Sequence, residues 1–346
     1  MPKLIAMGEM LIDFVATERG VTLAEAEHFT KAAGGAPANV AVAAAKLGIS
    51  SGFLGKVGDD PFGHFLVDTL RNHGVDSSAI RYSQQARTGL AFVSLKADGD
   101  RDFVFFRHPS ADMRYAPDEI DLDYLASASI LHLGSLGLAA SPMHEAMHHA
   151  IESAQKANVR ISYDPNLRLS LWPNEEVARR EILSIWPAAS IIKISREELT
   201  FLSGAAALEA SVRTLWHDNL QLMAVTDGPA GCTLFTAQES VSVPGFSVPV
   251  ADTTGAGDAF AAALLSAMLR EEPAWHDLDA LAAMGRYANA VGALTTTAHG
   301  AIPALPSAAL VASFLATARA DSERPSDVNV TSRDPRKEVA HEGTPS

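Results

Sequence analysis

The residues best suited to chemistry lie in one stretch, VADTTGAGDAFAAALL, which spans residues 250–265. A glycine turn there separates strand-compatible residues from an alanine-rich run of helical character. The first amides of a helix lack partners within it, so we predict an anion hole at residues 255–258, formed by Gly255, Ala256, Gly257 and Asp258. Asp258 would also accept a proton from an attacking hydroxyl. The alternative is that Asp258 only caps the helix, a contribution of about 1 kcal/mol.

A second stretch, AAGGAPANVAVAAAKLG, covers residues 32–48 and also places glycines before a helix. Bare backbone at Gly34 and Gly35 would let a polyol approach closely, and the Asn39 amide both donates and accepts hydrogen bonds. Pro37 is expected in the first helical turn and Gly48 at the helix end. Taken alone, a Gly-Gly turn before a helix is more often structural than functional.

The composition indicates a globular protein that acts on small molecules. The chain has 346 residues, 47% of them hydrophobic, and a formal net charge of −14, which argues against nucleic acid or an anionic membrane as its main partner. Cys232 is the single cysteine, which excludes an intrachain disulfide and fits a reducing, cytoplasmic location. We expect Cys232 to be a buried apolar residue.

Neither a signal peptide nor a membrane span is predicted. Glu9 and Asp13 interrupt the apolar residues at the beginning of the chain, which predicts a first strand instead. Long uncharged stretches at 125–144 and 287–318 contain serine, histidine and glycine, and the second also contains Pro303 and Pro306.

Alternating short apolar runs and longer helical patterns indicate how these residues are positioned. Strands are expected within residues 3–8, 130–135, 159–164, 191–195 and 222–227, and helices within 62–73, 142–157 and 206–218. Such alternation predicts a parallel sheet with helices on both faces. Ligands in such folds bind beyond the carboxyl ends of the strands.

The segment TGLAFVSLKADGDRDFVFFRHPSADM departs from this alternation and predicts a hairpin around KADGD. Phe103, Phe105 and Arg107 share one face of its second strand by the two-residue period. Aromatic surface and a cation together suit a small lid over a polar ligand. The alternative is an edge hairpin that packs its aromatic side chains on the core.

Some patterns resemble catalytic motifs but fail in detail. HEAMH at 144–148 has the spacing of a zinc protease, with Glu175 or Glu176 as a distant third ligand, yet Ile151 and Ala154 occupy the places of the extended motif. His144 and His148 are expected on a solvated helix flank. GISSG at 48–52 follows a helix instead of a strand, so it is not a nucleophile elbow, and no phosphate-binding P-loop is present.

The two glycine stretches, in this order and separation, resemble the signature regions of the ribokinase-type (PfkB) carbohydrate kinases. Further segments agree, namely GKVGDDPFG (55–63), YDPNLR (163–168), KISREEL (193–199), VTDGPAG (225–231) and YANAVGALTTTAHGAIPALP (287–306). The similarity extends from about residue 3 to residue 318. GEMLIDF, RHPSADM and YDPNLR, followed by Leu171 and Trp172, most resemble the fructokinase branch.

The resemblance implies a ribokinase-like α/β fold, a three-layer α/β/α sandwich with a mostly parallel central sheet and a small β lid. It assigns residues 1–320 to one kinase domain with a discontinuous lid from about 11–33 and 86–112. Residues 321–346 have a polar composition without aromatic residues, which predicts a disordered tail. Lid pairing between two copies would make a homodimer.

The resemblance also assigns residues to roles. Asp258 would be the catalytic base, with the amides of 255–258 as the anion hole. The sugar would be bound by Asp13, Gly34, Gly35, Asn39, Phe105, Arg107 and Arg168. ATP would be bound by Lys193, Ser195, Thr226, Gly228, Gly231, Gly255, Gly257 and Asn289. Glu198 would act on Mg²⁺ through water, and a monovalent cation, K⁺, would lie near Asp252, Thr254 and Gly300.

Two positions depart from the family pattern. Ser195 stands where many members have Asn, and His108 where the fructokinase pattern has Asn.

The resemblance implies an ATP-dependent fructokinase that forms fructose 6-phosphate and ADP. A kinase of the same fold acting on 2-keto-3-deoxygluconate, another sugar or a nucleoside is an alternative, and a non-catalytic sugar-binding regulator is a more distant one.

Overall fold

The computed structural model describes residues 1–95, 101–271 and 275–323. The predicted hairpin turn at 96–100 and the part of the predicted tail from residue 324 onward lie outside these ranges. The last described helix, α10 (Ala308–Glu323), runs three residues past the boundary predicted at residue 320.

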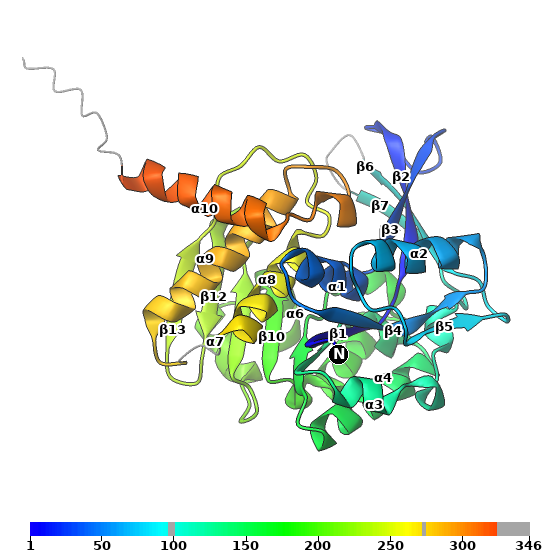
Figure 1. The fold of residues 1–346 in the computed structure, drawn as a ribbon, viewed down its shortest axis with the longest axis horizontal. Coiled ribbons are helices and arrows are strands. Elements are labelled where there is room, and N and C mark those ends of the chain that lie inside the picture. Colours follow the sequence, from blue (N-terminus) through cyan, green and yellow to red (C-terminus); the bar gives the residue numbers. More distant parts are fainter. Residues whose placement is uncertain (96–100, 272–274, 324–346) are drawn as a thin grey trace, which may run out of the picture.

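A nine-stranded sheet forms the centre of the described chain (Figure 1). Its order is β13-β12-β11-β10-β9-β8-β1-β4-β5, and β12 is the one strand of this sheet that runs opposite to the others. The mostly parallel sheet is therefore confirmed. The strands are β1 (Leu4–Met7), β4 (Ser51–Gly58), β5 (Ile80–Ser83), β8 (Ile130–Leu133), β9 (Arg160–Tyr163), β10 (Ile191–Ser195), β11 (Leu222–Thr226), β12 (Gly231–Phe235) and β13 (Ser240–Pro244).

Helices cover both faces of this sheet, and each face has its own apolar core. In β1, Leu4 and Ala6 join one core while Ile5 and Met7 join the other, as expected for a strand buried on both faces. The first core is covered by α1 (Ala36–Lys46), α2 (Pro61–Asn72), α8 (Ala256–Arg270), α9 (Leu278–Thr295) and α10. The second is covered by α3 (Leu122–Ala126), α4 (Met143–Lys156), α5 (Glu175–Ser184), α6 (Arg196–Ser203) and α7 (Leu208–Leu215).

Single turns of 3₁₀ helix join several of these elements. They lie at Asp112–Arg114, Pro117–Glu119, Leu136–Ala139, Leu169–Leu171, Trp186–Ala188, Gly228–Ala230 and Ile302–Ala304.

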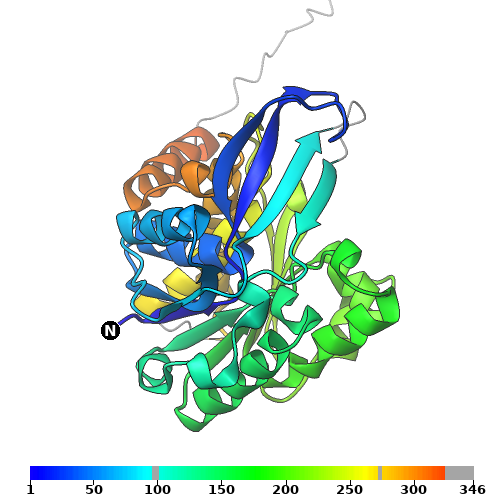
Figure 2. The same cartoon turned by 90° about the vertical axis from the view of Figure 1, so that its right-hand side faces the viewer.

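A separate four-stranded sheet projects from the body as a lid (Figure 2). Its order is β3-β2-β6-β7, with β2 (Leu11–Arg19), β3 (Phe29–Gly34), β6 (Gly89–Leu95) and β7 (Arg101–Phe106). The pairing register aligns Asp13 with Ala91 and Ala91 with Phe105, so these three residues share one face. The opposite face carries Phe14 and Phe92, whose rings stack with centroids 5.0 Å apart.

The patterns rejected in the sequence have structural explanations. HEAMH lies on α4, where Met143 and Met147 face the core, while His144 Nε2 is within hydrogen-bond distance of Glu181 Oε2, at 3.1 Å. Within the described ranges, no group of three or more His, Cys, Asp or Glu side chains is arranged to hold a metal ion, so neither Glu175 nor Glu176 completes such a site. Gly48 ends α1 with a φ of 85°, before β4 begins, which confirms the predicted order of helix and strand.

The expectation that Cys232 is a buried residue agrees with the structure. Cys232 is buried on β12 and is 4% exposed. No helix in the described part of the chain is long and apolar enough to cross a membrane.

Candidate active site

The start of α8 is built from a glycine turn. Gly255 is the N-cap residue with a φ of 78°, a left-handed conformation that glycine adopts without strain. No side chain caps the helix, so the structure does not support a role for Asp258 as a cap. Bonding within the helix begins where Ala259 N donates to Gly255 O at 2.8 Å. The amide of Ala256 donates to Thr253 O at 3.3 Å, so that member of the predicted anion hole is already engaged.

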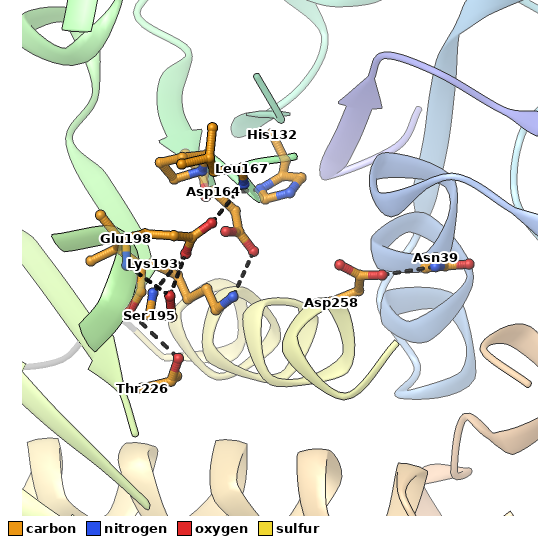
Figure 3. Close-up of polar contacts among 12 residues, drawn as sticks. Asn39, His132, Asp164, Leu167, Lys193, Ser195, Glu198, Thr226 and Asp258 are labelled. Carbon is orange, nitrogen blue, oxygen red and sulfur yellow. Dashed lines mark hydrogen bonds and ion pairs between the residues drawn. The ribbon is translucent and has the colours of Figure 1, made fainter. Parts of the chain in front are cut away.

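Asp258 lies in the first turn of α8 and is held from α1. Asn39 Nδ2 donates to Asp258 Oδ2 at 2.8 Å, and this bond joins the two glycine-led helices (Figure 3). Burial raises the pKa of Asp258, against the Asn39 hydrogen bond and the charges of Lys193 and Arg168, which lower it. A carboxylate with a raised pKa is a stronger base than an ordinary aspartate.

Asp13 approaches the same place from the lid. A Cβ at Gly34 would lie 2.2 Å from Asp13 Oδ2, so only glycine fits beside this carboxylate. Burial, followed by the charge of Asp258, raises the pKa of Asp13 to about 7, while Arg168 lowers it. Asp13, Gly34, Asn39, Asp258 and Arg168, which are far apart in the sequence, therefore converge on one site.

A buried ion pair borders this site on the side of α8. Lys193 Nζ on β10 donates to Asp164 Oδ2 at 3.0 Å, just beyond the end of β9 (Figure 3). Burial would lower the pKa of Lys193, but Asp164, Glu198 and Asp258 outweigh it and raise that pKa. A Cβ at Gly257 would lie 2.9 Å from Lys193 Nζ, so the ammonium lies against the first turn of α8.

The neighbouring Glu198 fixes a helix start and a loop. Ser195 is the N-cap of α6, and its amide donates to Glu198 Oε2 at 2.9 Å in a capping box. Glu198 Oε1 accepts from Leu167 N at 2.6 Å, which ties the loop carrying Arg168 to α6. Arg168 itself is exposed at the surface of this loop.

Arg107 lies at the base of the lid, where it is buried rather than directed outward. Its guanidinium forms an ion pair with Asp112, and each residue is only 3% exposed. Glu9 is close enough for the positive charge of Arg107 to act on its pKa. Phe105 shares a face with Asp13, as described above. The side chain of Phe103 lies outside the described residues.

The loop before α8 brings the predicted cation residues together. Asp252 Oδ1 accepts from Thr254 N at 2.9 Å and from Thr254 Oγ1 at 2.6 Å. Asp252 Oδ2 accepts from Gly300 N at 2.9 Å, so this aspartate joins the loop before α8 to the loop after α9.

The predicted nucleotide residues fall into two groups. Thr226 ends β11 beside Ser195, and its hydroxyl is 3.5 Å from Ile194 O. Gly228 is exposed in the next turn. Asn289, by contrast, is buried on α9 and donates to Val243 O and Pro244 O, both at 3.1 Å.

Gly231 also has a role within the fold. It begins β12 with a φ of 107°, and a Cβ there would lie 2.2 Å from Val243 O. Asn289 and Gly231 thus support the end of β13.

Comparison with known proteins shows which family has this arrangement. The family model for pfkB family carbohydrate kinases matches residues 1–308. The chain belongs to the pfkB family of carbohydrate kinases. This kinase is 49% identical over 315 residues to fructokinase-2 of Oryza sativa subsp. japonica, covering 91% of this chain and 94% of the rice protein.

Solved structures agree with this relationship. The fructokinase of Xylella fastidiosa with bound ATP has a TM-score of 0.85 and 35% identity to this kinase, covering 92% of this chain and 100% of that one. A double mutant of the fructokinase of Vibrio cholerae O395, bound to fructose, ADP and potassium ion, has a TM-score of 0.81 and 33% identity. That comparison covers 90% of this chain and 98% of that one.

Two buried residues of the site were not singled out from the sequence. Asp164 follows β9 directly, and Glu9 lies two residues beyond the end of β1. Both therefore lie at the carboxyl ends of strands in a parallel sheet, where ligand sites form. A charged residue just after a buried apolar strand was the signal that would have identified them.

Proposed function

We propose that this carbohydrate kinase is an ATP-dependent fructokinase, which converts D-fructose and ATP to fructose 6-phosphate and ADP. The observation that carries the proposal is the hydrogen bond between Asn39 and Asp258, which joins both glycine-led helix starts in one buried site. The 49% identity to named fructokinases supports fructose as the sugar.

In the proposed site the sugar lies between the lid and the two helix starts. Asp13, Gly34, Gly35 and Asn39 bind its hydroxyl groups, with Phe105 on the same lid face as Asp13. Arg168 reaches the sugar or the phosphates from the loop held by Glu198. Lid closure would exclude water, whose own hydroxyl is otherwise a competing acceptor.

Phosphoryl transfer then requires the acceptor oxygen, the γ-phosphorus and the leaving oxygen to be in line. Asp258 takes the proton of the 6-hydroxyl as the new oxygen–phosphorus bond forms and the bond from the γ-phosphorus to ADP breaks. The amides of Gly257 and Asp258 at the start of α8 stabilise the charge on the transferring group. Lys193 adds a positive charge directly beside them.

The proposed nucleotide side extends from Lys193 along the ends of β10 and β11. Ser195, Thr226 and Gly228 line it, and Asn289 and Gly231 act by holding the end of β13. This division follows from their contacts. Ser195 and Thr226 are the last residues of their strands, and Gly228 lies in the turn. Asn289 forms hydrogen bonds with the backbone, and Gly231 packs against it.

Two ions are part of the proposal. Glu198 has an oxygen-only side chain suited to Mg²⁺, and it would act through water because both its oxygens accept bonds from the protein. Asp252, Thr254 and the loop at Gly300 offer oxygen ligands suited to K⁺ directly before the anion hole. A related fructokinase structure contains potassium ion. Such ions would supply positive charge near the phosphates.

The outward parts of the lid support the proposed homodimer. Val104 and Phe106 lie on the lid face of Phe14 and Phe92 and are 44% and 60% exposed, which is unusual for neighbouring apolar residues on one small sheet, while Val15, 38% exposed, lies on the opposite face. Pairing two lids would remove this surface from water.

An assay of ADP release tests the assignment of the substrate. Fructose, 2-keto-3-deoxygluconate, ribose and adenosine are compared, each with and without K⁺. A keto acid needs an additional cation for its carboxylate, and Arg168 alone would have to supply it because Arg107 is already paired with Asp112, which favours fructose. Higher kcat/KM for the keto acid or adenosine would replace the assignment, and no ADP release with any acceptor would favour a sugar-binding regulator.

A further inference from the structure

The ion pair between Asp164 and Lys193 is the feature whose position calls for an explanation. Asp164 directly follows β9, Lys193 is the middle residue of the neighbouring parallel strand β10, and their charged atoms are 3.0 Å apart (Figure 3). Asp164 is 3% exposed and Lys193 is 8% exposed. A pair this deep is screened little by solvent.

The pair is poorly explained by stability alone. Asp164 Oδ1 is buried and has no hydrogen-bond partner among the described residues, so this carboxylate is only partly satisfied. Buried ion pairs of this kind often contribute nothing to stability in comparison with apolar residues of similar size. A functional constraint therefore accounts better for the pair than folding does.

The position of the Lys193 ammonium indicates what this functional constraint is. Lys193 is held so that Nζ lies against Gly257, one residue before Asp258. A lysine side chain has about 2 kcal/mol of rotamer entropy, so an unrestrained ammonium would occupy many positions. Asp164 is the only residue with a hydrogen bond to Lys193 Nζ in the described part of the chain.

The buried imidazole beside the pair adds no competing charge. His132 on β8 contacts Ser162 Oγ through Nδ1 at 3.0 Å. Burial, and then the nearby Lys193, lower the pKa of His132 to about 3, so it is neutral at physiological pH. His132 therefore does not compete as a cation with Lys193 for the Asp164 carboxylate.

We propose that Asp164 is a positioning residue for phosphoryl transfer, holding the Lys193 ammonium against Gly257 where the charge of the transferring group develops. The inference rests on the proposed kinase function and extends it to a residue that touches neither sugar nor Asp258. Because this interaction matters most in the transition state, loss of Asp164 lowers kcat more than it raises the KM for fructose.

A double-mutant cycle tests this proposal. Lys193→Met is expected to lower kcat on the order of 10²-fold, as when one donor to a transition-state charge is removed. Asp164→Asn is expected to lower kcat about tenfold or more, with the KM for fructose within about twofold of its original value. In the Lys193→Met background, Asp164→Asn should cause no further loss of kcat, because its partner is already absent.

The control is the Lys56–Glu119 ion pair, which lies away from the site with atoms 2.7 Å apart. Glu119→Gln removes a carboxylate from a lysine in the same way and should leave kcat unchanged. Melting temperatures and fructose binding by calorimetry separate loss of folding from loss of positioning. Additive effects of the two substitutions, or a change in fructose KM alone, would overturn the role of Asp164. Failure of the original enzyme to release ADP would instead overturn the proposed function.

Discussion

At the scale of single residues, the site depends on what burial does to carboxylates. Burial raises the pKa of both Asp13 and Asp258, and Asp258 is close enough for its charge to raise the pKa of Asp13 further. The hydrogen bond from Asn39 and the charge of Arg168 lower the pKa of Asp258. The net effect is a pKa above that of an aspartate in water, so this carboxylate is a stronger base.

Replacing the base tests this account directly. Asp258→Asn keeps the shape and the hydrogen bond to Asn39 but cannot accept the proton. We expect kcat to fall by about 10²- to 10⁴-fold, the usual contribution of general-base catalysis, while fructose and ATP still bind. Steady-state kinetics and calorimetry measure the two effects, and near-normal turnover would remove Asp258 from this role.

Glu9 provides a test of the electrostatics at the base of the lid. Burial raises its pKa to about 7, against the nearby charge of Arg107, and its Oε1 accepts from Ala36 N at 3.1 Å. The folded protein therefore retains a proton that the unfolded chain releases from about pH 4.5 upward. Stability from this group is fully present below that pH and is lost as the pH rises to about 7.

Glu9→Gln keeps the bond to Ala36 and removes the titration. The free energy of unfolding of the variant, relative to the original protein, should rise by as much as about 3 kcal/mol between pH 4.5 and 7.5. Urea unfolding at several pH values measures this difference. A difference that does not change with pH would show that Glu9 ionises normally.

At the scale of elements, the first turn of α8 uses two glycines for different reasons. Gly255 has a φ of 78°, and a Cβ there would lie 2.9 Å from the Ala301 side chain and 3.1 Å from Ala301 Cα. Gly257 is helical, and a Cβ there would meet only the Lys193 ammonium and its neighbouring carbon. Gly255 is therefore needed for the backbone conformation of the turn, and Gly257 for the position of the Lys193 charge.

Alanine substitutions should separate the two functions. Gly255→Ala should destabilise the protein by about 1–2 kcal/mol, because alanine is strained in the left-handed region. Gly257→Ala should leave stability unchanged or raise it by up to about 1 kcal/mol, since alanine favours a helix, yet it should lower kcat by displacing Lys193. Thermal unfolding and kcat are measured for both. Equal loss of stability in the two variants would contradict this distinction.

At the scale of the whole molecule, the lid projects from the body of the described chain. Figure 2 shows its strands extending beyond the helices, and its exposed apolar residues lie on this projection. Apolar side chains in such a position favour association with a second apolar surface. The proposed dimer uses the corresponding lid of another copy.

Phe106→Asp should shift the protein toward the monomer, because it places a charge in the surface that would be buried. Leu310→Asp is the matched control, since Leu310 is 52% exposed on α10, away from the lid. Sedimentation measurements over a range of concentrations distinguish the outcomes. The lid would be excluded as the interface if the Phe106→Asp variant remained dimeric. It would also be excluded if the unsubstituted protein were monomeric.

The sequence by itself determined the parallel sheet, because each buried strand is a short apolar run whose pattern differs from that of a helix. It also determined the helix starts at residues 36 and 256, where glycine and proline act through local backbone geometry. The position of Asp258 in the first turn followed from the same local rule.

Only the tertiary structure decided which partners these residues have. Arg107 lies on the predicted lid face by the two-residue period, yet its charge is paired with Asp112 inside the protein. Lys193 and Asp164 are 29 residues apart, and Asn39 and Asp258 are 219 apart. The physical reason is that a periodic pattern specifies only the face of an element, whereas the pairing of buried charges depends on which strand ends and helix starts the fold brings together.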